Sequence, residues 1–147
     1  MSDSWAASYA FDQYLWQPDG NTHHGIGLFF AFGASDGNPN PIQYSFLAGI
    51  GGNGVVPGRP DDNFGVVLAR SEFSSAFLPF LRQRLDLGLK REDAIEMYYN
   101  AAITPWLNVT TDLQIINPAL EKTLNMAGQL AAVETAVVIG TRLRVRF

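Results

Sequence analysis

The last dozen residues of the chain, 136–147, alternate between two kinds of side chain. The odd positions are apolar except for Thr141, and the last even positions are Arg142, Arg144 and Arg146. Successive side chains of a β-strand point to opposite faces of its sheet. This stretch therefore predicts a strand with one apolar face and one face of guanidinium groups. A half-buried soluble sheet and a sheet in a membrane both fit it, so the rest of the chain has to distinguish them.

Six further segments alternate in the same way and are bounded by turn residues. They lie at about residues 5–16, 25–33, 44–51, 64–70, 95–104 and 107–115. Two longer stretches do not alternate. Residues 73–91 have apolar positions at near-helical spacing, which predicts a short helix or a folded loop, and residues 117–135 have Ala- and Leu-rich helical character. The sequence therefore predicts one mainly all-β domain, residues 1–147, without an internal boundary.

The composition is poor in charge and contains no long apolar run. Charged residues make up 16% of the chain, against about 25% in soluble domains. No apolar run reaches about 18 residues, which excludes a transmembrane helix. Proteins that cross a membrane with strands have this composition, since half of each strand is polar, but so does a soluble β domain rich in Gly and aromatic residues. The net charge of −4 argues against nucleic acid as a partner, and the absence of cysteine excludes a disulfide framework.

The predicted connections alternate in length along the chain. The turn between the fifth and sixth strands is Pro105-Trp106 alone, whereas the connections after the fourth and sixth strands run to about twenty residues. In a β-barrel that crosses a membrane, short turns lie on one side and long loops on the other. If the C-terminus is on the short-turn side, both long connections fall on the opposite side. The order of the connections therefore favours a transmembrane β-barrel.

Two short motifs resemble catalytic or metal-binding arrangements, but neither predicts such a site. Asp61 and Asp62 are adjacent in a turn, where their side chains diverge, so they are better suited to bind the backbone than to act as an acid–base pair for glycoside hydrolysis. His23 and His24 have no acidic or Cys partner at ligand spacing. A nucleophile elbow and a phosphate loop are also missing. We therefore expect no enzyme, no catalytic residue, no metal and no cofactor.

Several motifs follow one another in order along the chain, beginning with Gly27-Leu28-Phe29-Phe30. The others are Phe32-Gly33, Asn40-Pro41-Ile42, the turn Val56-Pro57-Gly58-Arg59-Pro60-Asp61-Asp62 with Gly65 after it, Glu96-Met97-Tyr98-Tyr99-Asn100, Thr104-Pro105-Trp106-Leu107, Asp112-Leu113-Gln114, Asn117-Pro118 and Arg142-Leu143-Arg144-Val145-Arg146-Phe147. Each motif alone is weak, but together they are specific and cover essentially the whole chain. On these motifs the chain resembles the carbohydrate-selective porins of the OprB family.

The resemblance implies a channel for sugars in the outer membrane of a Gram-negative bacterium, built as a sixteen-stranded antiparallel barrel. This chain would match about seven C-terminal strands and would form a curved open sheet if alone. The implied partners are mono- or oligosaccharides, outer-membrane lipid and the missing N-terminal strands, and the sequence leaves open whether the barrels form homotrimers. The N-terminus has no secretory signal, which an outer-membrane protein needs, so either the location is wrong or the chain lacks its natural beginning. Since bacterial barrels have an even number of strands from eight upward, we expect a fragment, a truncated reading frame or half of a pair.

The cost of placing charge in lipid predicts which face of each strand would line the channel. An Arg that faces lipid at mid-depth costs roughly 2–4 kcal/mol, so three of them on one strand face could cost up to about 6–12 kcal/mol. By the parity of their strands, the predicted pore-lining and sugar-contacting residues are Asp12, Glu96, Tyr98, Asn100, Asp112, Gln114, Arg142, Arg144 and Arg146. The alternative is that the arginines only pair with Glu96 and Asp112 as part of the electrostatics of the wall.

Three further expectations follow from the pattern. Arg70 falls on the apolar parity of its strand and could snorkel to the membrane interface. The segment Ser75–Leu87 either constricts the channel or packs on its rim, and the sequence favours the rim. The rival to the channel is a soluble all-β module that binds a small ligand. That rival explains the missing signal better, but it explains neither the alternation of the connections nor the terminal Phe147.

Overall fold

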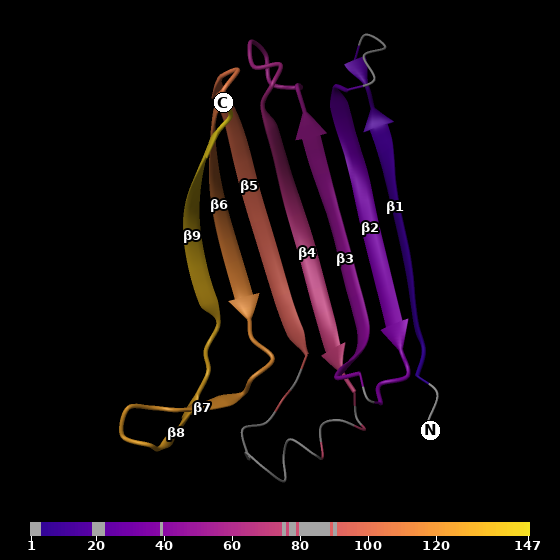
Figure 1. Ribbon diagram of the computed structural model, residues 1–147, viewed down its shortest axis with the longest axis vertical. Helices are drawn as coiled ribbons and strands as arrows, with labels where there is room; N and C mark the ends of the chain where they lie inside the picture. Colours follow the sequence, from indigo (N-terminus) through magenta and orange to yellow (C-terminus); the bar gives the residue numbers. More distant parts are fainter. Residues whose placement is uncertain are drawn as a thin grey trace.

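The computed structural model describes residues 4–18, 23–38, 40–74, 76, 79, 89 and 91–147. Seven long strands form one antiparallel sheet in which neighbours in the chain are neighbours in space (Figure 1). They are β1 Ala6–Trp16, β2 Gly25–Ser35, β3 Ile42–Asn53, β4 Asn63–Phe73, β5 Glu92–Thr104, β6 Leu107–Asn117 and β9 Ala136–Val145. The predictions of an all-β fold and of seven long strands are confirmed.

The predicted helical character of residues 117–135 is wrong. This segment contains a small hairpin of β7, Lys122–Leu124, and β8, Leu130–Ala132. The Oδ1 atom of Asn125 accepts hydrogen bonds from the backbone N–H groups of Ala127 and Gln129, and Gly128 has a left-handed φ of 72°. Asn and Gly favour such a turn over a helix interior, so local turn chemistry outweighs the Ala and Leu content.

The other predicted break in alternation, at residues 73–91, is hardly tested. Apart from Phe73 at the end of β4, Ser74 and a few isolated positions, this stretch lies outside the described residues, and so does almost all of the segment Ser75–Leu87. In the part of the chain that is described, no helix is long and apolar enough to cross a membrane.

The two ends of the sheet differ in their connections, as the sequence predicts. The β3–β4 and β5–β6 turns lie at the end that also holds the C-terminus (Figure 1). The strands that precede the two long connections, β4 and β6, both end at the opposite end of the sheet, where β1 begins. The sheet therefore has a short-turn end and a long-connection end.

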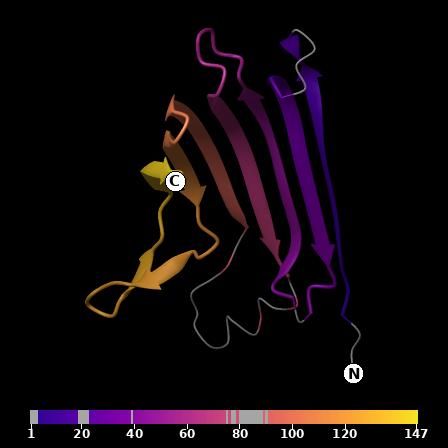
Figure 2. The same cartoon turned by 45° about the horizontal axis from the view of Figure 1, so that its top comes forward.

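Strand register gives the sheet two chemically different faces. The middle row of the first face, which we call the apolar face, consists of Leu28, Ile50, Val66, Met97, Leu113 and Ile139, each paired with the next. The opposite face, which we call the polar face, carries the row Asn53, Asn63, Asn100, Thr110 and Arg142. A second view shows that the sheet curves, because β9 is seen nearly end-on while β1 to β4 lie side by side (Figure 2).

The apolar face is not covered by another layer of the described chain. Leu68, Leu143 and Ile139 are 50%, 68% and 81% exposed. Among the described residues, Ala119 is the single buried hydrophobic residue. A soluble domain of this length normally buries a substantial core, and this sheet has none.

Charge occurs on the apolar face near the long-connection end. Arg70 donates a hydrogen bond from Nε to Oδ1 of Asp93 on the next strand, and its guanidinium carbon lies 5.7 Å from the centre of the Phe46 ring. Arg91 Nε is 3.3 Å from the other carboxylate oxygen of Asp93. Arg70, which the sequence analysis expects to reach the membrane interface, is paired with Asp93 in the sheet, and the snorkelling itself stays a prediction.

Candidate functional site

The polar face is hollowed into a cavity of about 720 Å³, centred on β5, β6 and β9. Seven of the nine residues that the sequence predicts to line a channel contribute to it, namely Glu96, Tyr98, Asn100, Asp112, Arg142, Arg144 and Arg146. They converge because each occupies the same parity of its strand and the register aligns these parities. Asn100 pairs with Thr110, for example, which in turn pairs with Arg142.

The two remaining predicted residues lie on the same face but outside this cavity. Gln114 is paired with Glu96 and donates a hydrogen bond of 3.3 Å from Nε2 to the Asp112 carboxylate. Asp12 is on β1, at the far edge of the sheet, where it lines a second cavity of about 400 Å³. Asn53, Asn63 and Tyr98 line both cavities, so the two are continuous along the polar face.

Arg142, Arg144 and Arg146 line the cavity, and none of them forms an ion pair in the part of the chain that the structure describes. Arg142 and Arg144 occupy alternate positions of the edge strand, Arg146 follows directly after it, and all three are exposed. Within the described residues, no ion pair joins any of them to Glu96 or Asp112. The alternative in which the arginines only pair with Glu96 and Asp112 thus has no direct contact among the described residues, and the choice between the two interpretations stays a prediction. Their guanidinium groups can donate hydrogen bonds to a solute.

Gly140 determines where the Asp112 carboxylate lies. Asp112 and Gly140 are paired across β6 and β9, and a Cβ atom at Gly140 would overlap both carboxylate oxygens. The Asp112 side chain therefore lies over Gly140 of β9, two residues before Arg142 on the same face. Sequence analysis did not single out Gly140, since its role depends on the register of two strands.

Five polar residues that line the larger cavity were also missed, Asn53, Asn63, Thr104, Asn108 and Thr110. Asn53 and Asn63 end and begin their strands next to a turn, where asparagine is common for other reasons. Asn108 and Thr110 share the parity of Asp112, which was the available signal. Acidic, basic and uncharged polar side chains therefore lie together along the wall of the cavity.

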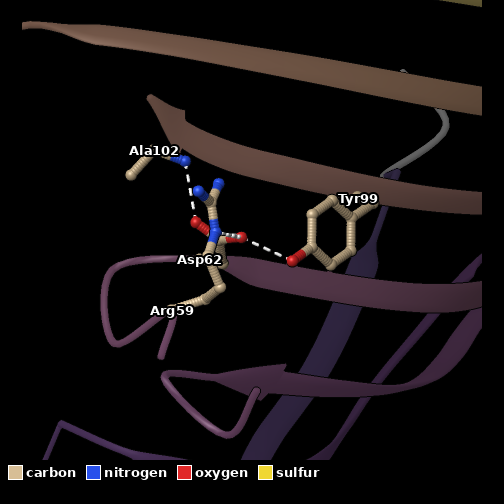
Figure 3. Close-up of polar contacts among 4 residues, drawn as sticks. All are labelled: Arg59, Asp62, Tyr99 and Ala102. Atoms are coloured by element: carbon tan, nitrogen blue, oxygen red, sulfur yellow. Dashed lines mark hydrogen bonds and ion pairs between the residues drawn. The ribbon is translucent and has the colours of Figure 1, made fainter. Parts of the chain in front are cut away.

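The turn between β3 and β4 is held by the buried carboxylate of Asp62 (Figure 3). Asp62 is 3% exposed and accepts hydrogen bonds from Arg59 Nε at 2.8 Å, from the Tyr99 hydroxyl and from the backbone N–H of Ala102 at 2.9 Å. Burial alone would raise the pKa of Asp62, but the hydrogen bonds from Arg59, Tyr99 and Ala102 outweigh it and leave the pKa below its ordinary value. The carboxylate is therefore charged at neutral pH and fastens the turn to β5.

The two motifs that were considered for catalysis or metal binding are now placed. Asp61 lines the larger cavity while Asp62 is buried in its network, so the two carboxylates diverge as predicted. His23 and His24 also line the cavity. Among the described residues there is no group of three or more His, Cys, Asp or Glu side chains that could hold a metal ion.

Comparison with known proteins assigns the chain to a family. A family model described as "Carbohydrate-selective porin, OprB family" matches residues 1–147. The chain belongs to the OprB family. Membership implies the outer membrane of a Gram-negative bacterium as the location.

A structural comparison agrees with the OprB assignment. The sheet is similar to a structure of Pseudomonas putida OprB at high pH, with a TM-score of 0.75 and 22% sequence identity. The match covers 94% of this chain and 34% of that porin, so the chain spans about a third of its length. A search of the curated proteins found no match to the chain.

Proposed function

We propose that this chain forms part of the wall of an outer-membrane channel through which sugars diffuse passively. The observation that carries the proposal is the contrast between the two faces of the sheet. One face gathers three arginines around a polar cavity, with no ion pair to any carboxylate among the described residues, and the other exposes aliphatic side chains. Water suits the first face and hydrocarbon the second.

The energetic argument for this orientation is one-sided. An Arg held against lipid at mid-depth costs roughly 2–4 kcal/mol, whereas an Arg in an aqueous channel costs little. The opposite orientation would place Arg142, Arg144 and the carboxylates of Glu96 and Asp112 in hydrocarbon and leave the aliphatic rows in water. The rival soluble module requires a covered apolar face, and the described chain offers no layer to cover it.

The cavity lining suits a neutral polyol. Guanidinium groups donate hydrogen bonds, carboxylates accept them, and asparagine and threonine side chains do both. Such exposed partners exchange readily with water, so each contact is weak. Passive transport needs contacts that are favourable enough to admit the solute and weak enough to release it. The same exposed groups would also pass small ions.

We further propose that the chain supplies seven neighbouring strands at the C-terminal end of a larger barrel. Among the described residues no strand pairs with the outer edge of β1 or of β9, and an unpaired edge is costly in hydrocarbon. β1 and β9 are the first and the seventh strand of an antiparallel sheet, so they run in the same direction. A second copy in the same membrane orientation would therefore place β9 parallel to β1.

An all-antiparallel barrel requires an odd number of added strands instead. The coverage of about a third of Pseudomonas putida OprB supports strands from the rest of a porin as the source. We call the assembly of this chain with the strands that pair with β1 and β9 the closed barrel. Gel filtration in detergent and single-channel recording test this proposal, and stable conductance from the chain alone would overturn it. Whether closed barrels form homotrimers can be read from the same gel filtration.

Sugar passage is tested with the closed barrel in liposomes. Replacing Arg144 and Arg146 together by Gln should slow glucose uptake, since it removes two charged donors from the cavity. Arg91→Gln is the matched control, because Arg91 is exposed at the long-connection end and lines neither cavity. Glucose uptake that equals the wild-type rate in the double variant would rule out a role for these arginines.

A further inference from the structure

Two aromatic side chains of the polar face lie along the wall instead of projecting from it. Phe29 of β2 is paired with Gly49 of β3, and a Cβ atom at Gly49 would overlap its ring. Tyr98 of β5 is paired with Gly65 of β4, and a Cβ atom at Gly65 would lie 2.7 Å from Cε1 of its ring. Each ring therefore reaches across to the neighbouring strand and rests on the glycine there.

The two rings reach toward each other. Phe29 extends from β2 onto β3, Tyr98 extends from β5 onto β4, and β3 and β4 are adjacent. Gly65 pairs with Gly51, which is two residues from Gly49 along β3. With strands about 4.8 Å apart and about 3.4 Å per residue, the two resting places are roughly 8 Å apart.

Both rings line the cavity of about 400 Å³, and both are partly exposed to it. Between them the floor of the cavity includes Gly27 and Gly51, which have no side chains to separate a solute from the rings. The result is a narrow apolar strip across four strands of an otherwise polar wall. We call Phe29 and Tyr98 together the aromatic strip.

The groups around the aromatic strip are hydrogen-bonding ones. Asp12 is paired with Phe29 across β1 and β2, and Asn53 and Asn63 line the same cavity beside Tyr98. A cyclic sugar has the complementary distribution, with C–H groups over its ring faces and hydroxyl groups around its rim. An acyclic polyol of the same size has no extended C–H face.

We propose that the aromatic strip is a sugar-contacting subsite that selects cyclic sugars over acyclic polyols. The C–H face of a pyranose ring contacts Phe29 and Tyr98, while Asp12, Asn53 and Asn63 bind its hydroxyl groups. Gly49 and Gly65 are positioning residues, because a side chain at either position would lift a ring away from the wall. This inference rests on the proposed channel function and adds Phe29 to the residues that contact the sugar.

The test compares uptake of glucose and of sorbitol by the closed barrel in liposomes, at concentrations where uptake is proportional to concentration. Wild type should favour glucose. If a sugar face on an aromatic ring is worth as much as a pair of aromatic rings, about two- to tenfold, Phe29→Leu and Tyr98→Leu should each lower the glucose-to-sorbitol ratio by about that factor. Gly65→Ala, which keeps Tyr98 but displaces its ring, should lower the ratio as well.

Gly33→Ala is the matched control, since Gly33 lies on the same face away from the strip and its Cβ would meet only the Ser45 hydroxyl at 2.8 Å. It should leave the ratio unchanged. A wild-type ratio near one, or a ratio that neither leucine variant changes, would overturn the aromatic strip and leave the channel proposal standing. Failure of wild type to pass either solute would instead overturn the channel proposal.

Discussion

Placing one arginine on each side of β4 tests the assignment of the two faces. Leu68 is the sixth residue of the eleven-residue strand Asn63–Phe73, so it lies at mid-strand. At about 3.3 Å per residue and a tilt near 40°, such a strand spans roughly 25 Å of membrane, with Leu68 close to the middle. The side chain is 50% exposed on the apolar face, between Ala48 and Ile95.

Leu68→Arg should therefore lower the free energy of unfolding of the closed barrel by about 2–4 kcal/mol, the full mid-depth cost. This corresponds to a folded-to-unfolded ratio that falls by roughly 30- to 700-fold, and to a urea midpoint lower by about 1 M or more. The measurement is urea unfolding in lipid vesicles, followed by tryptophan fluorescence. Leu68→Ala separates the loss of apolar contact from the cost of the charge.

Val67→Arg is the matched control. Val67 precedes Leu68, is also apolar, and lies on the polar face opposite Glu96. An arginine there enters the aqueous side beside a carboxylate, so its effect on stability should stay within about 0.5 kcal/mol. Equal losses of stability in Leu68→Arg and Val67→Arg would refute the assignment of lipid to one face and water to the other.

The remaining predictions concern the buried carboxylate and the ion pair on the apolar face. Asp62→Ala should lower the free energy of unfolding by about 1–3 kcal/mol, because it removes the buried carboxylate that accepts hydrogen bonds from Arg59, Tyr99 and the Ala102 N–H, whereas Asp61→Ala, next to it, should have little effect in the same urea titration. Since the pKa of Asp62 is lowered in the folded state, its contribution is complete above the ordinary value near 3.9 and is lost as the pH falls through the lowered value; the difference in urea midpoint between wild type and Asp62→Ala should therefore be constant from pH 7 to about pH 5 and shrink below about pH 4. Removing Asp93 should destabilise the barrel less when Arg70 is also replaced by Leu, because the single change leaves an unpaired cation on the apolar face; strictly additive effects in this double-mutant cycle would contradict the pairing.

Sequence reasoning located the strands because its signals are local. Alternation of side chains and turn residues depends only on near neighbours along the chain, and these signals placed all seven long strands. Where local signals conflict, the prediction failed. Residues 117–135 are rich in Ala and Leu, yet the turn at Asn125 and Gly128 makes a hairpin there.

The candidate site was predictable on the strands whose two faces differ in polarity. On β9 the arginines mark the polar face directly. On β5 and β6 the polar residues Glu96, Asn100, Asp112 and Gln114 do so as well. On β2 and β4 polar side chains are few, so the local pattern separates the two faces mainly by residue size, with Phe30 and Leu68 among the larger apolar residues and Phe29 and Val67 among glycine and alanine. The register with neighbouring strands then joins Phe29 and Val67 to the polar face.

The sequence by itself therefore determined the kind of protein: an antiparallel all-β sheet, with short and long connections at opposite ends and one strand face that is too charged for lipid. The tertiary structure decided which glycine lies beside which side chain. It set Phe29 on Gly49, Tyr98 on Gly65 and Asp112 on Gly140. The physical reason is that side-chain alternation is a property of one strand, whereas register is a property of two strands and is fixed only when they pair.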